Sequence, residues 1–200
     1  TCGNDVVALI DMVQGLDTIK PKTSELLYSI WDVGFSAVLG RHECAMQGIM
    51  FRWSGGSKYL WCEAMLCAQL EWGDIAGNIL HWALLRRHYK QITIVLDMVS
   101  FLKTQTPAFH KKYVNIPMSN GDTAIHLACR ERLLEPTKRL CKHRCVELLK
   151  NANGFTAAHE CALNNFVEGL EILEAYTTKD STWYDAIHDA LRVGVQHGQI

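Results

Sequence analysis

The sequence lacks both a long apolar run and a surplus of charge of either sign. None of its apolar stretches approaches the roughly 18–20 residues that a helix needs to cross a bilayer. Its 20 basic and 21 acidic residues give a formal net charge of −1, so no overall field attracts nucleic acid or an anionic lipid surface. We therefore expect neither a nucleic acid nor a membrane as a direct partner.

The opening residues also lack the features of a secretory signal. The segment Thr1–Asp5 has no basic region and no apolar core follows it in the manner of a signal peptide. The chain starts at Thr1 rather than at methionine, and we expect it to be part of a longer protein. Most of its eight cysteines lie among Ala, Leu and Met, which favours reduced, buried thiols over a disulfide framework. The expected location is intracellular, in the cytoplasm, the nucleus or both.

Known motifs for catalysis are absent from the sequence: it has no nucleophile elbow, no glycine-rich phosphate loop and no HExxH pair. The best metal candidate is Cys141–Cys145, with three possible ligands in five residues, but zinc needs a fourth ligand and no second cluster is near. We predict no metal, no cofactor and no catalytic residue. The alternative is a cysteine-dependent hydrolase, in which Cys44 or Cys62 pairs with a histidine and the rest of the chain docks the substrate.

The sequence does contain one motif four times, in Asn78–Ala83, Thr123–Ala128, Thr156–Cys161 and Asp185–Ala190. Each copy opens with Asn, Thr or Asp, residue types whose side chains cap helix N-termini. A histidine follows three positions later, and a small residue, Ala or Cys, stands two positions after the histidine. Because all three features recur together, the motif predicts a series of similar helical units.

The spacing of the histidines supports a repeat. His126 and His159 are 33 residues apart, whereas the spacing from His81 to His126 is 45 and that from His159 to His188 is 29. A period of 33 is typical of ankyrin repeats. The first repeat therefore has more residues than the 33-residue period, and the extra residues fall at 100–112. We expect them to form an extended loop or to lengthen the second helix of that repeat.

The segment Gly121–Ala128 resembles the signature of the ankyrin-repeat family, and Gly154–His159 is a looser copy of it. The resemblance covers about residues 74–193 and implies an all-α solenoid of about four helix-turn-helix units. Residues 1–73 are expected to form a helical capping segment or a degenerate repeat, and residues 74–200 the repeat domain. The long first unit and the segment Gly121–Arg130 also resemble the inhibitor-of-NF-kappa-B subgroup.

The sequence departs from the family six residues after each of the first three repeat histidines, where the family usually has glycine. Arg87, Arg132 and Asn165 stand there instead. Since arginine adopts the left-handed conformation at a cost, we expect the first helix of the first two units to end differently, for example by running longer. The resemblance implies a structural role for the residues of the repeated motif, which are Asn78, His81, Gly121, Thr123, His126, Gly154, Thr156, His159 and His188.

The resemblance implies a protein–protein interaction module rather than an enzyme. It would bind its partner through the concave helix face and the turn tips, and the subgroup points to a Rel-type transcription factor or a signalling adaptor. A regulatory scaffold inside a larger chain is a second alternative. The expected contact residues lie one, four and five positions after each of the first three repeat histidines: Trp82, Leu85, Arg86, Leu127, Arg130, Glu131, Glu160, Leu163 and Asn164.

Overall fold

The structure is a computed structural model that describes residues 70–72, 75–105, 113–143, 148–177 and 181–198. The chain divides into two compact units. Among the described residues, the first unit contains two helices, α5 (Ile79–Leu85) and α6 (Tyr89–Gln105). Nearly all of the predicted capping segment, residues 1–69, lies outside the described part of the chain. Within that part, no helix is long and apolar enough to span a membrane.

Among its described residues, the second unit contains a short hairpin and five helices that are seen over their full length. The hairpin pairs two three-residue strands, β1 (Leu70–Trp72) and β2 (Ile75–Gly77), most of which belong to this unit. The helices are α8 (Ala124–Arg130), α9 (Leu134–Lys142), α10 (Ala157–Leu163), α11 (Val167–Tyr176) and α12 (Ser181–Gln196). The fold is therefore helical, as predicted, apart from a hairpin that the repeat pattern did not reveal.

The first unit is one helix pair. The Asn78 side-chain oxygen accepts hydrogen bonds from the amides of Leu80 and His81, both at 3.1 Å, so α5 begins where the motif predicts. The helices α5 and α6 pack against each other through buried side chains that include Leu84 and Ile92. α6 has 17 residues where α9 has 9 and α11 has 10, so the lengthened second helix takes up at least part of the surplus; residues 106–112 lie outside the description.

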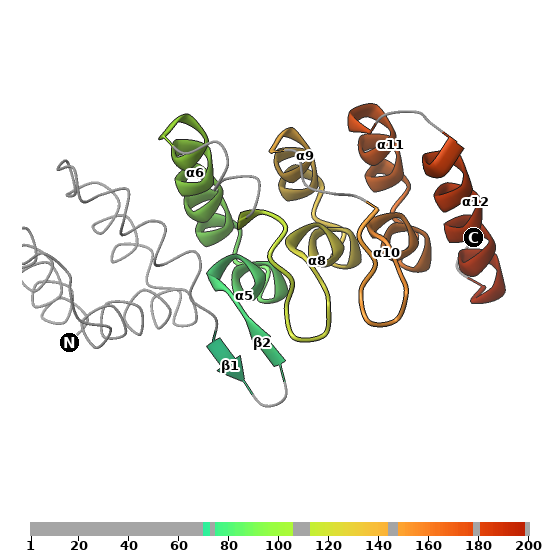
Figure 1. Cartoon of the computed structure of the whole chain (residues 1–200), viewed down its shortest axis with the longest axis horizontal. Helices are drawn as coiled ribbons and strands as arrows, with labels where there is room; N and C mark the ends of the chain where they lie inside the picture. The colour runs from blue at the N-terminus through green and yellow to red at the C-terminus, as the bar shows by residue number, and fades with distance from the viewer. Residues whose placement is uncertain (1–69, 73–74, 106–112, 144–147, 178–180, 199–200) are drawn as a thin grey trace, which may run out of the picture. The chain divides into compact units, whose positions relative to one another are not determined.

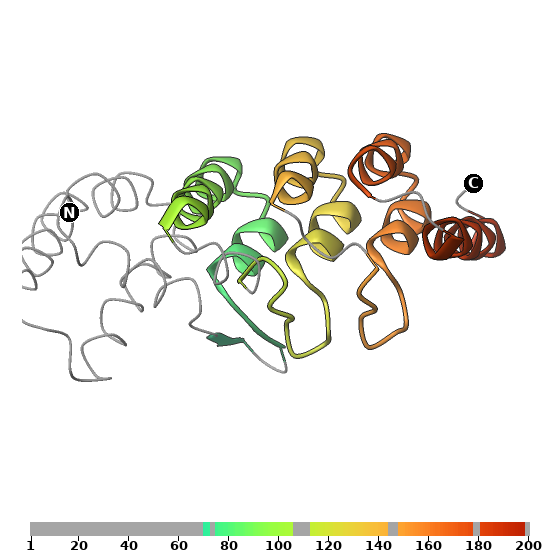
Figure 2. The same cartoon turned by 45° about the horizontal axis from the view of Figure 1, so that its top comes forward.

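The second unit stacks two such helix pairs. α8 pairs with α9, and α10 pairs with α11; α8 also packs beside α10, and α9 beside α11. The short helices α8 and α10 thus form one row and α9 and α11 a second, and Figures 1 and 2 show these two rows from two directions. Ile125, Leu140 and Leu173 are fully buried between them. Each pair supplies the apolar wall that its neighbour lacks, which is how repeat proteins obtain a core.

The three short helices end in the same way, which corrects one expectation. α5, α8 and α10 each have seven residues, and Arg87, Arg132 and Asn165 adopt positive φ values of 53°, 55° and 48°. In α8, Arg132 and Leu133 donate their amide protons to the carbonyls of Cys129 and Ala128, closing the helix in a Schellman motif. The arginines therefore take the left-handed conformation that glycine takes in the family, and the helices do not run longer.

Two loops project before α8 and α10 and form matching turns. Gly121 donates its amide to the Met118 carbonyl, and Gly154 donates its amide to the Asn151 carbonyl. Both glycines have positive φ, 79° and 78°. Backbone bonds join the loops in sequence: Ala152 donates to the Asn120 carbonyl at 3.0 Å. The first loop is joined to β2 in turn, because Ser119 donates to the Ala76 carbonyl at 2.9 Å.

The predicted fourth helix-turn-helix repeat needs correction, because α12 is a single helix. It begins at Ser181, so Asp185 lies inside it rather than capping it, and His188 is exposed instead of occupying a structural position. α12 packs against α10 and buries Trp183 and Ala190. It closes the apolar side of α10 without forming another helix pair among the described residues.

Candidate functional site

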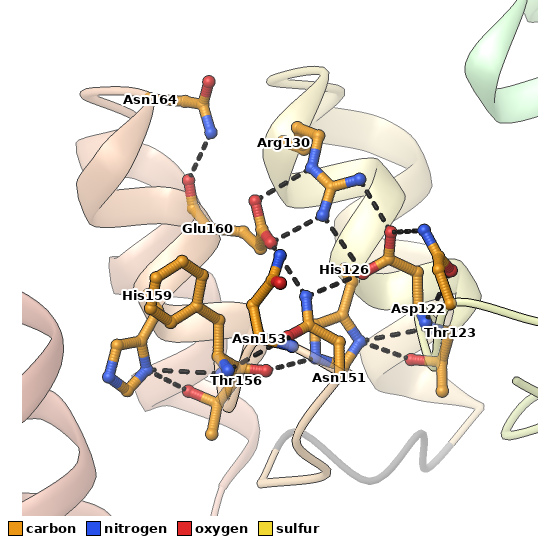
Figure 3. A network of polar contacts seen from close by, with 12 residues as sticks. Asp122, Thr123, His126, Arg130, Asn151, Asn153, Thr156, His159, Glu160 and Asn164 are labelled. Carbon is orange, nitrogen blue, oxygen red and sulfur yellow. Dashed lines mark hydrogen bonds and ion pairs between the residues drawn. The ribbon is translucent and has the colours of Figure 1, made fainter. Parts of the chain in front are cut away.

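The centre of the second unit is a polar network around Arg130, at the last turn of α8 (Figure 3). Its guanidinium contacts both oxygens of Asp122, at 2.7 and 3.0 Å, and both oxygens of Glu160, at 2.6 and 3.0 Å. Asp122 precedes α8 in its own repeat, whereas Glu160 lies on α10 of the next. One arginine thus links two successive repeats through two bidentate ion pairs, the strongest geometry available to it.

Two asparagines complete this network. The Asn151 side-chain amide donates to Asp122 at 2.8 Å and to Glu160 at 3.2 Å, and its oxygen accepts from the amides of Asn153 and Phe155. Asn120 donates to Asp122 at 2.9 Å. The network therefore fixes both loops to both short helices.

The carboxylates of the network are buried and depend on their partners. Asp122 and Glu160 are 1% and 3% exposed, while the Arg130 side chain is 30% exposed. Burial acts to raise the pKa of Asp122, but hydrogen bonds from Arg130 and Asn151 outweigh it and hold that pKa below its ordinary value. The hydrogen bond to Glu160 is the largest influence that raises the pKa of Arg130.

The repeated histidines join neighbouring elements. Thr123 donates its amide proton to Nδ1 of His126 at 3.2 Å, and the Thr123 hydroxyl lies 2.9 Å from the same nitrogen. Nε2 therefore carries the ring proton and donates to the Phe155 carbonyl of the next repeat at 3.0 Å. Desolvation by burial lowers the pKa of His126, so the neutral ring is favoured.

His159 and His81 make the same local bonds. Thr156 donates its amide proton to Nδ1 of His159 at 3.3 Å, and Nε2 of His159 lies 3.2 Å from a carboxylate oxygen of Asp189 on α12. In the first unit, the Asn78 amide donates to Nδ1 of His81 at 3.0 Å. These three histidines thus accept a backbone hydrogen bond within their own repeats, whereas His188 is exposed, as described above.

The expected contact residues fall into two groups. Trp82, Leu127 and Glu160 are 6%, 1% and 3% exposed, so the positions directly after the histidines offer almost no surface to a partner, and the prediction for these three needs correction. The positions four and five after the histidine keep some surface: Arg86 is exposed, and Leu85, Arg130, Glu131, Leu163 and Asn164 are partly exposed. Arg130 is also committed to the network, so it is not a free rim charge.

The structure describes three of the eight cysteines, and neither cysteine of the hydrolase alternative is among them. Cys129, Cys141 and Cys161 are buried and form no disulfide in the described structure. Cys44, Cys62 and Cys145 lie outside the description. Among the residues that are described, no group of three or more His, Cys, Asp or Glu side chains could hold a metal ion.

Sequence patterns missed several members of the network. Asp122 and Asn151 have Phe155 and Met118 as their counterparts 33 residues away, so neither polar residue recurs and a search for repeats passes over both. Asn120 offered a local signal, because Asn and Asp two residues apart in a turn often bond to each other or to the backbone. The Asp122 amide does donate to the Asn120 side chain, at 3.0 Å.

Comparison with known proteins agrees with this architecture. The chain resembles a solved structure, the crystal structure of the yeast ribosomal protein Rps3 in complex with its chaperone Yar1, with a TM-score of 0.59 and 20% identity, over 80% of this chain and 99% of that chain. At this identity the likeness concerns the fold. No curated protein matches the chain significantly. A family model of ankyrin repeats in three copies matches residues 80–182, more than half of the 200 residues, and the chain therefore belongs to the ankyrin-repeat family.

Proposed function

We propose that the chain binds another protein through the inner face of its second unit. This inner face is defined by the last turns of α8 and α10 and the tips of the two loops: Ser119, Asn120, Arg130, Glu131, Ala152, Asn153, Leu163 and Asn164. The loop-tip residues are exposed, and the four helix residues are partly exposed. Leu163 contributes apolar area, while the remaining residues are mostly polar or charged.

The observation that carries this proposal is the buried network beneath the inner face. Asp122, Asn151 and Glu160 hold the loops and the helices in one arrangement through bonds of 2.6–3.2 Å. A surface that is already ordered loses less conformational entropy when it binds, so more of the contact energy appears as affinity. The buried ion pairs are costly to desolvate, and preorganising a recognition surface is a reason to keep them.

Two further points support a protein as the partner. The ankyrin-repeat family is built on helix-pair stacks that present extended surfaces, and the similar solved structure is a complex between two proteins. The partner that fits the subgroup resemblance of Gly121–Arg130 is a Rel-type transcription factor or a signalling adaptor, which places the chain in the cytoplasm or nucleus and gives it a regulatory role. Glu131, at the rim, would affect the association rate more than the final affinity.

The experiment is affinity capture with the whole chain, followed by calorimetry on the captured partner after purification. Leu163→Arg and Ala152→Arg each place a bulky cation on the inner face without removing a bond of the network. Ala175→Arg makes the same kind of change on the exposed side of α11 and serves as the control. We expect both inner-face variants to lose at least about tenfold in affinity, while the control and the unfolding midpoints stay unchanged. Equal affinity in all three variants would move the binding surface elsewhere.

A further inference from the structure

A second surface of this unit lies on the outer helices α9 and α11. Each helix begins with a large apolar residue that faces solvent: Leu134 is 51% exposed and Val167 is 56% exposed. Both stand eight residues after the repeat histidine, and α9 packs beside α11, so the two apolar side chains occupy the same level of adjacent helices. Tyr89, 61% exposed, holds the same position in the first unit.

The charges on these two helices differ in sign. α9 exposes Lys138 and Lys142, and α11 exposes Glu171 and Glu174. Lys138 and Glu171 are 33 residues apart and so occupy equivalent positions, one turn after the exposed apolar residue. The described structure gives neither of them an ion-pair partner. We define the outer face as Leu134, Lys138 and Lys142 on α9 together with Val167, Glu171 and Glu174 on α11.

We propose that the outer face pairs with the same face of a second copy of this chain. A face that is basic on one half and acidic on the other complements itself when a two-fold axis exchanges the halves, as in isologous dimers. The occupant is therefore another molecule of the same sequence, and the pairing does not depend on the partner proposed for the inner face.

The charge pattern also selects the direction of the two-fold axis. An axis parallel to the helices sets α9 of one copy against α11 of the other and keeps the register. Leu134 then faces Val167, and Lys138 faces Glu171, twice in each dimer. An axis across the helices would set α9 against α9 and bring lysines together, which like-charge repulsion disfavours. The parallel arrangement is the one in which both the apolar and the charged residues find partners.

One pair of charges opposes this arrangement. Glu135 and Glu168 lie in the first turns of α9 and α11, where the helix dipole favours acidic residues. They are equivalent positions too, so the proposed dimer brings them near one another with like charge. Replacing both with glutamine should strengthen the association, which is a consequence that a chance apolar contact would not have.

The test is sedimentation velocity of the whole chain over a range of concentrations at low salt. We expect a monomer–dimer equilibrium that weakens as salt is added, because the paired charges are exposed. Lys138→Glu and Glu171→Lys should each raise the dimer dissociation constant at least about tenfold, since each converts two attractions into two repulsions. Lys150→Glu and Asp185→Lys change exposed charges outside the outer face and serve as matched controls.

Charge exchange distinguishes this pairing from general electrostatic effects. The double variant Lys138→Glu/Glu171→Lys should dimerise like the original chain, and an equimolar mixture of the two single variants should form the mixed dimer. A chain that remains monomeric at all concentrations would overturn the proposal. So would a dimer whose dissociation constant the two single variants leave unaltered, or one that the double variant fails to restore.

Discussion

The second unit has two junctions, one between its two repeats and one between the second repeat and α12. At each junction Nε2 of a repeat histidine makes a hydrogen bond, but the surroundings of the two bonds differ. Between the two repeats, His126 donates to a backbone carbonyl, that of Phe155, beside a buried network of charges. Between the second repeat and α12, His159 instead meets the side chain of Asp189, which is 42% exposed and also bonded to Arg192. The internal junction thus has many bonds that depend on one another, whereas the terminal junction relies on apolar packing and one exposed carboxylate. We expect the free energy of unfolding to respond far more strongly to changes at the internal junction.

Removing the Arg130 side chain is the change with the largest expected effect on the free energy of unfolding. Arg130→Met should lower the free energy of unfolding by about 3–5 kcal/mol, because it leaves two buried carboxylates without a counter-charge. Arg192→Met, at the exposed terminal junction, should change it little. Urea denaturation followed by circular dichroism measures both.

A triple variant separates the missing charge from the missing contact area. Asp122→Asn and Glu160→Gln added to Arg130→Met should recover much of the loss, because neutral amides are cheaper to bury than unpaired carboxylates. If Arg130→Met unfolds at the same urea concentration as the original chain, the network does not hold the two repeats together.

The two turn glycines allow the same comparison at the level of the backbone. A methyl group on Gly121 would lie 2.8 Å from the Ala152 nitrogen, whereas one on Gly154 would meet nothing within 4 Å. Both residues have positive φ, so both alanine variants carry the left-handed penalty of about 1–2 kcal/mol. Gly121→Ala should lose a further 1–3 kcal/mol, roughly, from overpacking. Denaturant titrations that show equal losses would contradict the close approach of the two loops.

The pH dependence of stability should also reflect the internal junction. The pKa of His126 in the folded chain lies below its ordinary value of 6.5, so the unfolded chain binds a proton first as the pH falls through that value. The contribution of His126 to the free energy of unfolding should therefore be fully present above about pH 7 and be lost as the pH falls toward the pKa of the folded chain. Asp122, whose pKa is also lowered, adds a second decline below its ordinary value of 3.8.

The control for this effect is an exposed histidine in α12. His126→Gln should flatten the decline in the free energy of unfolding just below pH 6.5, whereas His188→Gln should leave it in place. The hydrogen bond to the Phe155 carbonyl, and then the nearby charges of Asp122 and Glu160, act to raise the pKa of His126, but burial is the larger influence and lowers it. An unchanged slope in His126→Gln would assign the decline to another group.

These comparisons also show what the repeat pattern can predict. Residues that recur every 33 positions, such as Thr123 with Thr156 and His126 with His159, identified the helix starts. The pattern failed at Asp185, where Trp183 stands in place of the glycine that precedes Thr123 and Thr156 by two residues. There the helix runs from Ser181 through Asp185, so Asp185 is an interior residue of α12.

Long-range polar contacts were beyond this kind of prediction. Asp122 and Asn151 are 29 residues apart and have no polar counterparts in the other repeat. Their bond depends on how the two loops approach each other in space, which local sequence does not encode. For the same reason, the burial of Leu127 and Glu160, and hence their unsuitability as contact residues, emerged only with the fold.

The smallest expected effect concerns the residues that close the short helices. Arg132 and Asn165 both have positive φ, but asparagine tolerates that conformation better than arginine does. Arg132→Gly should raise the free energy of unfolding by about 0.5–1 kcal/mol, after the greater entropy of glycine in the unfolded chain is subtracted. Asn165→Gly should have a smaller effect, and thermal or urea unfolding of the two variants measures the difference. If Arg132→Gly destabilises the chain, the arginine side chain makes contacts worth more than the backbone strain, and the departure from the family's glycine stabilises this protein.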